Sequence, residues 1–127
     1  MYKIKTICII NDDDIFTFIL KKSITKLNVC GQVITFSNGQ EAMDAFSISG
    51  AVVPEIILLD INMPIMDGWG FLSEFEIIKT NEKVDIYLIS AHVSDEDCLK
   101  VKTNKRITGI LSDPTDNETI MKIVNEY

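Results

Sequence analysis

The sequence predicts an α/β fold, in which a doubly wound, five-stranded parallel sheet carries helices on both faces. Short runs rich in Ile, Val and Leu alternate five times with segments of helical apolar spacing, and this alternation is typical of parallel sheets. The chain has 127 residues, of which 46% are apolar and 24% charged, as in ordinary globular domains. No repeat, linker or low-complexity tract divides it, so we expect one domain spanning residues 1–127.

Five runs are predicted as strands. Each has four or five residues and is rich in aliphatic side chains, as expected of short strands that are buried on both faces. They comprise residues 6–10, 32–36, 56–59, 85–89 and 107–111.

Apolar residues at helical spacing predict helices between and after these strands. Three apolar stripes stand out in the sequence. They are Phe16, Leu20, Ile24 and Leu27; Phe71, Phe75 and Ile78; and Ile120, Ile123, Val124 and Tyr127. Each stripe would pack one face of a helix against the sheet.

Polar pairs three residues apart mark three helix starts, with the spacing of a capping box. The pairs are Asn38 with Glu41, Ser94 with Asp97, and Thr115 with Glu118. The second predicted helix covers residues 39–48 and the fourth covers residues 94–102. Because the fourth helix is short and polar, we expect it to be loosely held.

Charge and cysteine content exclude several classes of function. A net charge of −7 repels nucleic acid backbones and anionic membranes, so we expect neither as a partner. Cys8, Cys30 and Cys98 lack the spacing of a zinc site and are expected to be reduced thiols. The apolar runs are shorter than a membrane span and no signal peptide is evident, so a cytoplasmic location is expected.

The most informative stretch begins where the third predicted strand ends. Four apolar residues, 56–59, run directly into Asp60, and a loop containing Asn62, Pro64 and Gly68 follows. Ligands bind at the carboxyl ends of strands in open α/β sheets, so a carboxylate delivered there is well placed for chemistry. The simpler alternative is that Asp60 only opens a turn.

A second acidic segment, residues 11–14, follows the first predicted strand. If the first and third strands are neighbours, Asp12 lies within reach of Asp60, and like charges so close need a cation or a proton. Oxygen ligands suit Mg²⁺, which takes one or two carboxylates and keeps several waters. Asp14 is expected only to cap the following helix.

Over nearly its whole length the chain resembles the receiver domain of two-component response regulators, the CheY-like family. Its most specific motif runs from Leu58 to Pro64 and continues as Met66, Asp67 and Gly68. The acidic segment and the pair Ser90-Ala91, which closes the fourth strand, follow the family's order. The resemblance implies a flavodoxin-like fold.

The resemblance also implies roles for individual residues. Asp60 would be the phosphoacceptor, which attacks the phosphoryl group of a phosphohistidine or of a small donor. Asp12 and Asp60 would hold Mg²⁺ together with the backbone carbonyl of Asn62. Ser90 would donate a hydrogen bond to a phosphoryl oxygen. Such a transfer depends mainly on positioning and charge neutralisation.

Three positions depart from the family pattern. Asn11 stands at the first position of the acidic pair, where its amide can still bond a metal-bound water. A one-residue slip would instead make Asp12 and Asp13 the pair, and the sequence leaves both registers open. Ile110 replaces an aromatic switch residue in the fifth strand, and an aliphatic side chain has no polar tip that could report on Ser90.

The largest departure is Asp113, which precedes Pro114 where the family has Lys-Pro. A lysine about 4 Å from a phosphoryl oxygen contributes on the order of 4 kcal/mol of Coulomb energy before desolvation. Aspartate reverses the sign of that interaction. Asp113 would turn to solvent, take up a proton or serve as an added metal ligand.

The sequence therefore predicts a single-domain response regulator, a phosphoprotein that takes a phosphoryl group on Asp60 from a histidine kinase or phosphotransfer protein. It would not be an enzyme, and it would signal by protein contacts through its fourth and fifth helices. The alternative is a pseudo-receiver, a binding module that acts independently of phosphorylation. An aspartyl-phosphate phosphatase is a third class, which carries a second Asp where this chain has Asn62. His92 is expected in an exposed loop, and Trp69 is expected to be a packing residue.

Overall fold

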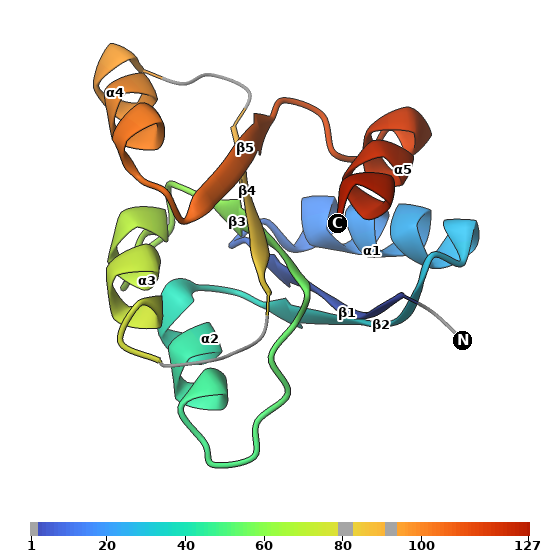
Figure 1. Cartoon of the computed structure of the whole chain (residues 1–127), viewed down its shortest axis with the longest axis horizontal. Helices are drawn as coiled ribbons and strands as arrows, with labels where there is room; N and C mark the ends of the chain where they lie inside the picture. The colour runs from blue at the N-terminus through green and yellow to red at the C-terminus, as the bar shows by residue number, and fades with distance from the viewer. Residues whose placement is uncertain (1–2, 79–82, 91–93) are drawn as a thin grey trace.

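The computed structural model describes residues 3–78, 83–90 and 94–127, so Ala91 and His92 lie outside the described residues. Strands and helices alternate along the chain (Figure 1). The elements are β1 (Ile4–Ile10), α1 (Asp14–Leu27), β2 (Cys30–Phe36), α2 (Gly39–Phe46), β3 (Ile56–Asp60), α3 (Gly68–Phe75), β4 (Asp85–Ile89), α4 (Asp95–Thr103), β5 (Ile107–Leu111) and α5 (Asn117–Glu126). Within the described ranges no helix is both long enough and apolar enough to cross a bilayer.

The strands form one parallel sheet in the order β2-β1-β3-β4-β5. Helices α1 and α5 cover one face, and α2 and α3 cover the other (Figure 1). The predicted doubly wound fold is confirmed. The chain winds outward in opposite directions from β1 and β3, and such a reversal point is where open α/β sheets bind ligands.

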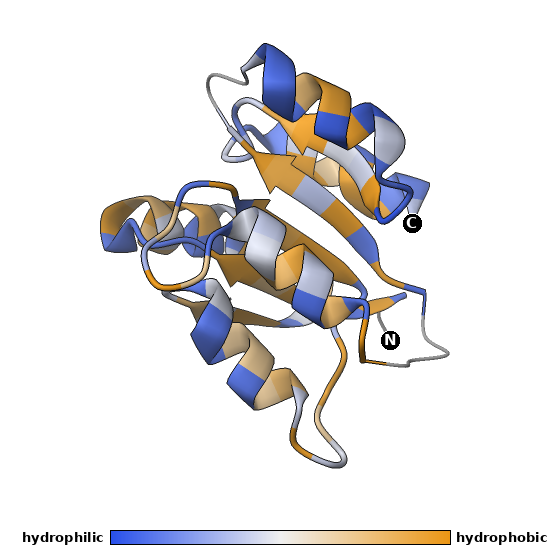
Figure 2. Ribbon diagram, turned by 90° about the vertical axis from the view of Figure 1, so that its left-hand side faces the viewer, coloured by the Kyte–Doolittle hydropathy of each residue, from blue (hydrophilic) through white to orange (hydrophobic). Residues whose placement is uncertain are grey.

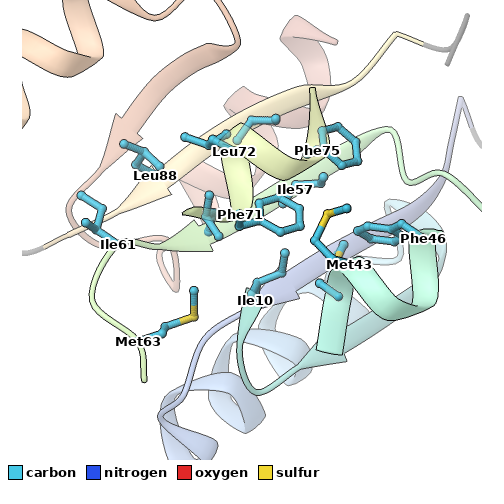
Figure 3. Close-up of a cluster of buried hydrophobic side chains, with 14 residues drawn as sticks. Ile10, Met43, Phe46, Ile57, Ile61, Met63, Phe71, Leu72, Phe75 and Leu88 are labelled. Carbon is cyan, nitrogen blue, oxygen red and sulfur yellow. The ribbon is translucent and has the colours of Figure 1, made fainter. Parts of the chain in front are cut away.

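The core has two halves because successive residues of a strand point to opposite faces of the sheet. Cys8 of β1 packs with α2 and α3, whereas its neighbour Ile7 packs with α1 and α5. Figure 3 shows the first half, in which Phe71 and Phe75 of α3 stack with ring centroids 5.4 Å apart. In Figure 2 the apolar strands lie between helices whose colours alternate between hydrophobic and hydrophilic. Both faces of the sheet are therefore covered, as parallel strands require.

The strand register brings three strand ends to the same edge. Ile10, the last residue of β1, pairs with Leu59 of β3, which pairs in turn with Leu88 of β4. Asp60 closes β3 one residue later and pairs with Ile89, the last residue of β4. The connections that leave β1, β3 and β4 therefore begin side by side.

Two predicted helix caps are wrong. The N-cap of α1 is Asp13 and not Asp14, because the Asp13 carboxylate accepts hydrogen bonds from the backbone N–H groups of Ile15 and Phe16. Thr115 does not cap α5, because its hydroxyl donates a 2.6 Å hydrogen bond to Asp113. The N-cap of α5 is Asp116, whose side chain makes no cap hydrogen bond.

The other two predicted caps are confirmed. The side chain of Asn38 accepts a hydrogen bond from the backbone N–H of Glu41 at 2.9 Å. The Ser94 hydroxyl accepts one from the backbone N–H of Asp97 at 3.1 Å. Both helix starts are thus held by the polar pairs seen in the sequence.

Gly68 fixes the start of α3 against the end of β3. Its backbone N–H donates to the carbonyl of Ile61 at 2.8 Å. A Cβ atom at Gly68 would lie 2.7 Å from the carbonyl oxygen of Asp60, a distance that real Cβ atoms do not reach. Only glycine therefore allows the helix to begin this close to Asp60.

We expect Gly68→Ala to lower the free energy of unfolding by about 1 to 3 kcal/mol, because the clash is with backbone and cannot be relieved by a rotamer change. Gly70→Ala in the same helix is the control, since a Cβ there meets the flexible side chain of Met66 at 3.1 Å. Denaturant unfolding of both variants measures the difference. Equal stabilities of the two variants would contradict the proposed role of Gly68.

Candidate functional site

An open pocket of about 460 Å³ lies at the carboxyl edge of the sheet, where the connections from β1, β3 and β4 begin. Seven of its nine lining residues are polar or charged, and they come from the ends of four strands and from the start of α1. The lining residues are Asn11, Asp12, Asp13, Phe16, Asp60, Asn62, Ile89, Ser90 and Ser112.

Asp60, the last residue of β3, lines this pocket. Its side chain is half-buried, and its carboxylate accepts a 3.3 Å hydrogen bond from the backbone N–H of Asn62. Ser90 follows β4, and its backbone N–H donates to the carbonyl of Leu111 at 3.1 Å. The pocket therefore brings Asp60, Asn62 and Ser90 together at the sheet edge.

The pKa of Asp60 is raised from 3.8 to about 6. Burial is the largest cause, and the negative charge of Asp12 and a hydrogen bond with the Asp12 carboxyl act in the same direction. The backbone N–H groups of Asn62 and Ile61 partly oppose the rise because they stabilise the ionised carboxylate. Asp12 and Asp60 are thus close enough to repel each other.

The residues after β1 have different surroundings, although they are consecutive. Asn11 is 6% exposed, and its side-chain oxygen accepts a 2.9 Å hydrogen bond from the backbone N–H of Asp13. The Asp13 carboxylate caps α1 through Ile15. Asp12 is exposed and is the carboxylate that raises the pKa of Asp60. This geometry favours the register in which Asn11 and Asp12, and not Asp12 and Asp13, take the positions of the acidic pair.

The donor set around Asp60 fits a hard divalent cation. Within the described ranges no three His, Cys, Asp or Glu side chains converge on one point, so the candidate donors are the carboxylates of Asp12 and Asp60 with amide and carbonyl oxygens of Asn11 and Asn62. Mg²⁺ is commonly bound by one or two carboxylates and several waters. The mutual repulsion of the two carboxylates independently favours a cation at this point.

The loop between β3 and α3 contains a strained residue. Ile65 has φ +68° and is 82% exposed, and a positive φ is unfavourable for a β-branched residue. The backbone N–H of Met66 donates to the carbonyl of Pro64 at 2.7 Å, which closes a γ-turn around Ile65. The Met66 carbonyl accepts from the backbone N–H of Gly39 at 3.3 Å, so the loop is fixed to the start of α2.

The structure does not bring Asp113 into the pocket around Asp60. Asp113 is exposed, and its carboxylate accepts hydrogen bonds from the backbone N–H and the hydroxyl of Thr115. Ile110 is partly buried and packs against the core on the α2 and α3 face. Neither residue lines the pocket.

Phe16 and Ser112 line the pocket and were missed in the sequence. The sequence predicts Phe16 only as part of the apolar stripe of α1, where it also packs. Ser112 directly follows β5, so its position one residue after a strand end was the signal that could have identified it.

The raised pKa of Asp60 predicts how stability depends on pH. Because Asp60 binds its proton more tightly in the folded chain, its contribution to stability is greatest below pH about 4 and is lost as the pH rises through about 6. In metal-free buffer near neutral pH, Asp60→Asn should therefore raise the free energy of unfolding by about 1 to 2 kcal/mol, after allowance for solvent screening of a half-buried group. Denaturant unfolding across this pH range measures the gain.

Asp44→Asn is the control for that experiment, since Asp44 is an exposed residue of α2 outside the pocket and its loss changes the net charge equally. The gain from Asp60→Asn should disappear below pH about 4, where Asp60 is protonated. A gain that stayed constant over the whole pH range would contradict the assignment.

The sequences of two curated relatives align with most of this chain. A probable methanogenesis regulatory protein, FilR2, of Methanothrix harundinacea is 21% identical over 94% of the chain and 79% of its own length. The DNA-binding transcriptional regulator NtrC of Klebsiella pneumoniae is 26% identical over 92% of the chain. The chain spans only 23% of the length of NtrC, so the match covers one part of that larger protein.

Solved structures share the fold. A two-component response regulator from Cytophaga hutchinsonii has a TM-score of 0.83 and 23% identity, with 98% of this chain and 96% of that chain covered. A two-component response regulator from Legionella pneumophila has a TM-score of 0.82 and 23% identity, with 97% and 99% covered. Residues 7–125 match the family model described as the response regulator receiver domain. The chain belongs to the receiver domain family of two-component response regulators.

Proposed function

We propose that this receiver takes a phosphoryl group on Asp60 from a histidine kinase or phosphotransfer protein and signals by protein contact. The observation that carries the proposal is the placement of Asp60, a half-buried carboxylate at the end of β3 in a pocket shared with Asp12, and its raised pKa agrees with that placement. An ionised carboxylate in that position lowers the stability of the fold. Groups in pockets whose pKa is strongly shifted are frequently functional. The family relation supports the same residue as the phosphoacceptor.

In the proposed reaction a carboxylate oxygen of Asp60 forms a bond to phosphorus, while the bond from phosphorus to the donor nitrogen breaks. Ser90, on the pocket wall, would donate a hydrogen bond to a phosphoryl oxygen. Asp12, Asp60 and the backbone carbonyl of Asn62 would hold Mg²⁺, with Asn11 bonding a metal-bound water. When bound, the ion supplies charge neutralisation for the transferred group. The protein contributes mainly positioning.

The partners follow from this proposal. Donor and receiver exchange the phosphoryl group directly, so a cytoplasmic histidine kinase or phosphotransfer protein is the upstream partner. The downstream partner would contact the surface of α4 and α5. Both helices expose most of their residues. Acidic side chains are frequent on α4, whose first turn contains Asp95, Glu96 and Asp97.

A second candidate function is a pseudo-receiver that binds its partner without phosphorylation. The position of Asp113 favours it, because the family's lysine is replaced by a carboxylate that is hydrogen-bonded to Thr115 and lies outside the pocket. Without a cationic side chain at position 113, the phosphoryl group lacks one positive charge that would stabilise it. Direct measurement of phosphorylation separates the two functions.

We expect the wild-type chain, incubated with Mg²⁺ and acetyl phosphate, to gain the mass of one phosphoryl group, and Asp60→Asn to gain none. The amide cannot form the acyl phosphate, although it preserves the shape of the side chain. Asp14→Asn is the matched control, because Asp14 is an exposed residue in the same acidic region and does not line the pocket. Phosphorylation of Asp60→Asn at the wild-type rate would exclude Asp60 as the acceptor.

The proposal also predicts distinct effects for two substitutions of Asp113. Asp113→Asn keeps an oxygen for Thr115 and should change Mg²⁺ affinity less than about threefold, since an exposed charge outside the pocket interacts weakly with it. Asp113→Lys adds a long cationic side chain that can reach the pocket and should speed phosphorylation, by up to about fivefold if it stabilises the transition state by about 1 kcal/mol. Metal titration and the rate with acetyl phosphate measure both effects. A large loss of Mg²⁺ affinity in Asp113→Asn would instead make Asp113 a metal ligand.

A further inference from the structure

Helix α4 is held to the rest of the protein by few contacts. None of its residues is buried, whereas α1, α2, α3 and α5 each bury two or more residues. Val101 is partly buried against the core on the α2 and α3 face. Helices with little buried apolar surface open at low free energy cost. The placement of α4 is therefore sensitive to the few side chains that contact it.

Trp69 makes the most specific of these contacts. Its indole N–H donates a hydrogen bond to the Asp97 carboxylate at 3.2 Å, and the Lys100 amine lies 5.1 Å from the centroid of its ring. Asp97 and Lys100 are three residues apart, so one face of α4 rests on Trp69. Trp69 is itself partly buried against the core. In Figure 1 α4 lies next to α3, the helix that carries Trp69.

The same tryptophan is tied to the Asp60 pocket through its neighbour in sequence. Gly68 donates its backbone N–H to Ile61 at 2.8 Å and lies too close to the Asp60 carbonyl for any Cβ. The Asp67 carboxylate caps α3 by accepting from the backbone N–H of Gly70 at 2.8 Å. The backbone at Asp60 is therefore in direct contact with the first turn of α3, which carries Trp69.

We propose that Trp69 is a positioning residue that couples the state of the Asp60 pocket to the placement of α4. This inference rests on the proposed function, since the states it couples are the free and the occupied pocket. The route runs from Asp60 through Gly68 to Trp69 and Asp97, and it does not involve Ile110 of β5. Because α4 is weakly held, one hydrogen bond and one cation–π contact are enough to shift its equilibrium.

Amide exchange of residues 95–103 tests the coupling, measured with and without Mg²⁺ and acetyl phosphate. In the wild type, occupancy of the pocket should change the exchange of α4 about two- to tenfold, the range that one hydrogen bond supports. Trp69→Phe keeps an aromatic ring but loses the indole N–H, and it should reduce this response below about twofold. The mass of the phosphorylated chain, recorded on the same samples, shows whether Asp60 is still modified.

A matched pair on α4 separates the tryptophan contact from general effects on the helix. Asp97→Ala and Asp95→Ala both remove a carboxylate from the first turn of α4, but only Asp97 accepts from Trp69. Asp97→Ala should lose the response and Asp95→Ala should keep it. Emission from Trp69, the one tryptophan of the chain, should change on occupancy in the wild type and in Asp95→Ala only.

The outcomes distinguish this inference from the proposed function. If Trp69→Phe is phosphorylated and α4 responds as in the wild type, the coupling role of Trp69 is wrong. If the wild type takes no phosphoryl group, the proposed function fails, and the coupling is tested by Asp60→Asn instead. That substitution removes the repulsion with Asp12 and should change the exchange of α4 in the wild-type background but not with Trp69→Phe. An equal change in both backgrounds would overturn the inference.

Discussion

The parallel pairing of β1 with β3 is the constraint on which the rest of the structure depends. It places Ile10 beside Leu59, so the next residues of both strands leave the sheet at one point. The same pairing makes β1 and β3 the buried centre of the sheet, with the other strands added outward on both sides. Core and pocket are thus two consequences of one register, and a slip by one residue would disrupt both.

The pocket carries an electrostatic cost that the core must offset. Asp60 is partly removed from water and lies beside the carboxyl of Asp12, and both effects disfavour its ionised form. The strained backbone at Ile65 adds a second local cost in the adjoining loop. Two well-packed core halves make such a site tolerable. The well-packed sheet thus carries two unfavourable features at its carboxyl edge, the Asp60 pocket and the strained loop, together with a weakly held α4.

Much of the fold could be predicted because the spacing of apolar residues indicates which face of a helix or strand is buried. Strands β4 and β5 have the predicted bounds, and β3 extends by one residue to Asp60. The predicted start of β2 is two residues late, because Gly31 interrupts the apolar pattern. A Cβ at that position would lie 2.9 Å from the Lys5 carbonyl, so glycine is required there by close packing of β1 against β2. A sequence pattern does not reveal such a requirement.

The site was harder to predict than the fold. Asp12 and Asp60 are neighbours because β1 pairs with β3, and the alternation of strands and helices alone left this pairing as a condition. The direction of the Asp113 side chain depends instead on hydrogen bonds from Thr115, and the sequence left solvent exposure, protonation and metal binding open for this residue. The tie between Trp69 and Asp97 joins two helices across a gap of 28 residues, and no periodicity encodes it.

Chemical modification of Cys8 reports whether the sheet has opened. Cys8 is fully buried in the inner strand β1, and burial raises the pKa of its thiol, so the reactive thiolate is suppressed in the folded state. Cys30 and Cys98 are only partly buried, one at the edge strand and one on α4. Oxidants and alkylating reagents should therefore modify the chain in an order set by local stability. Damage at Cys8 would mark molecules whose central sheet has separated.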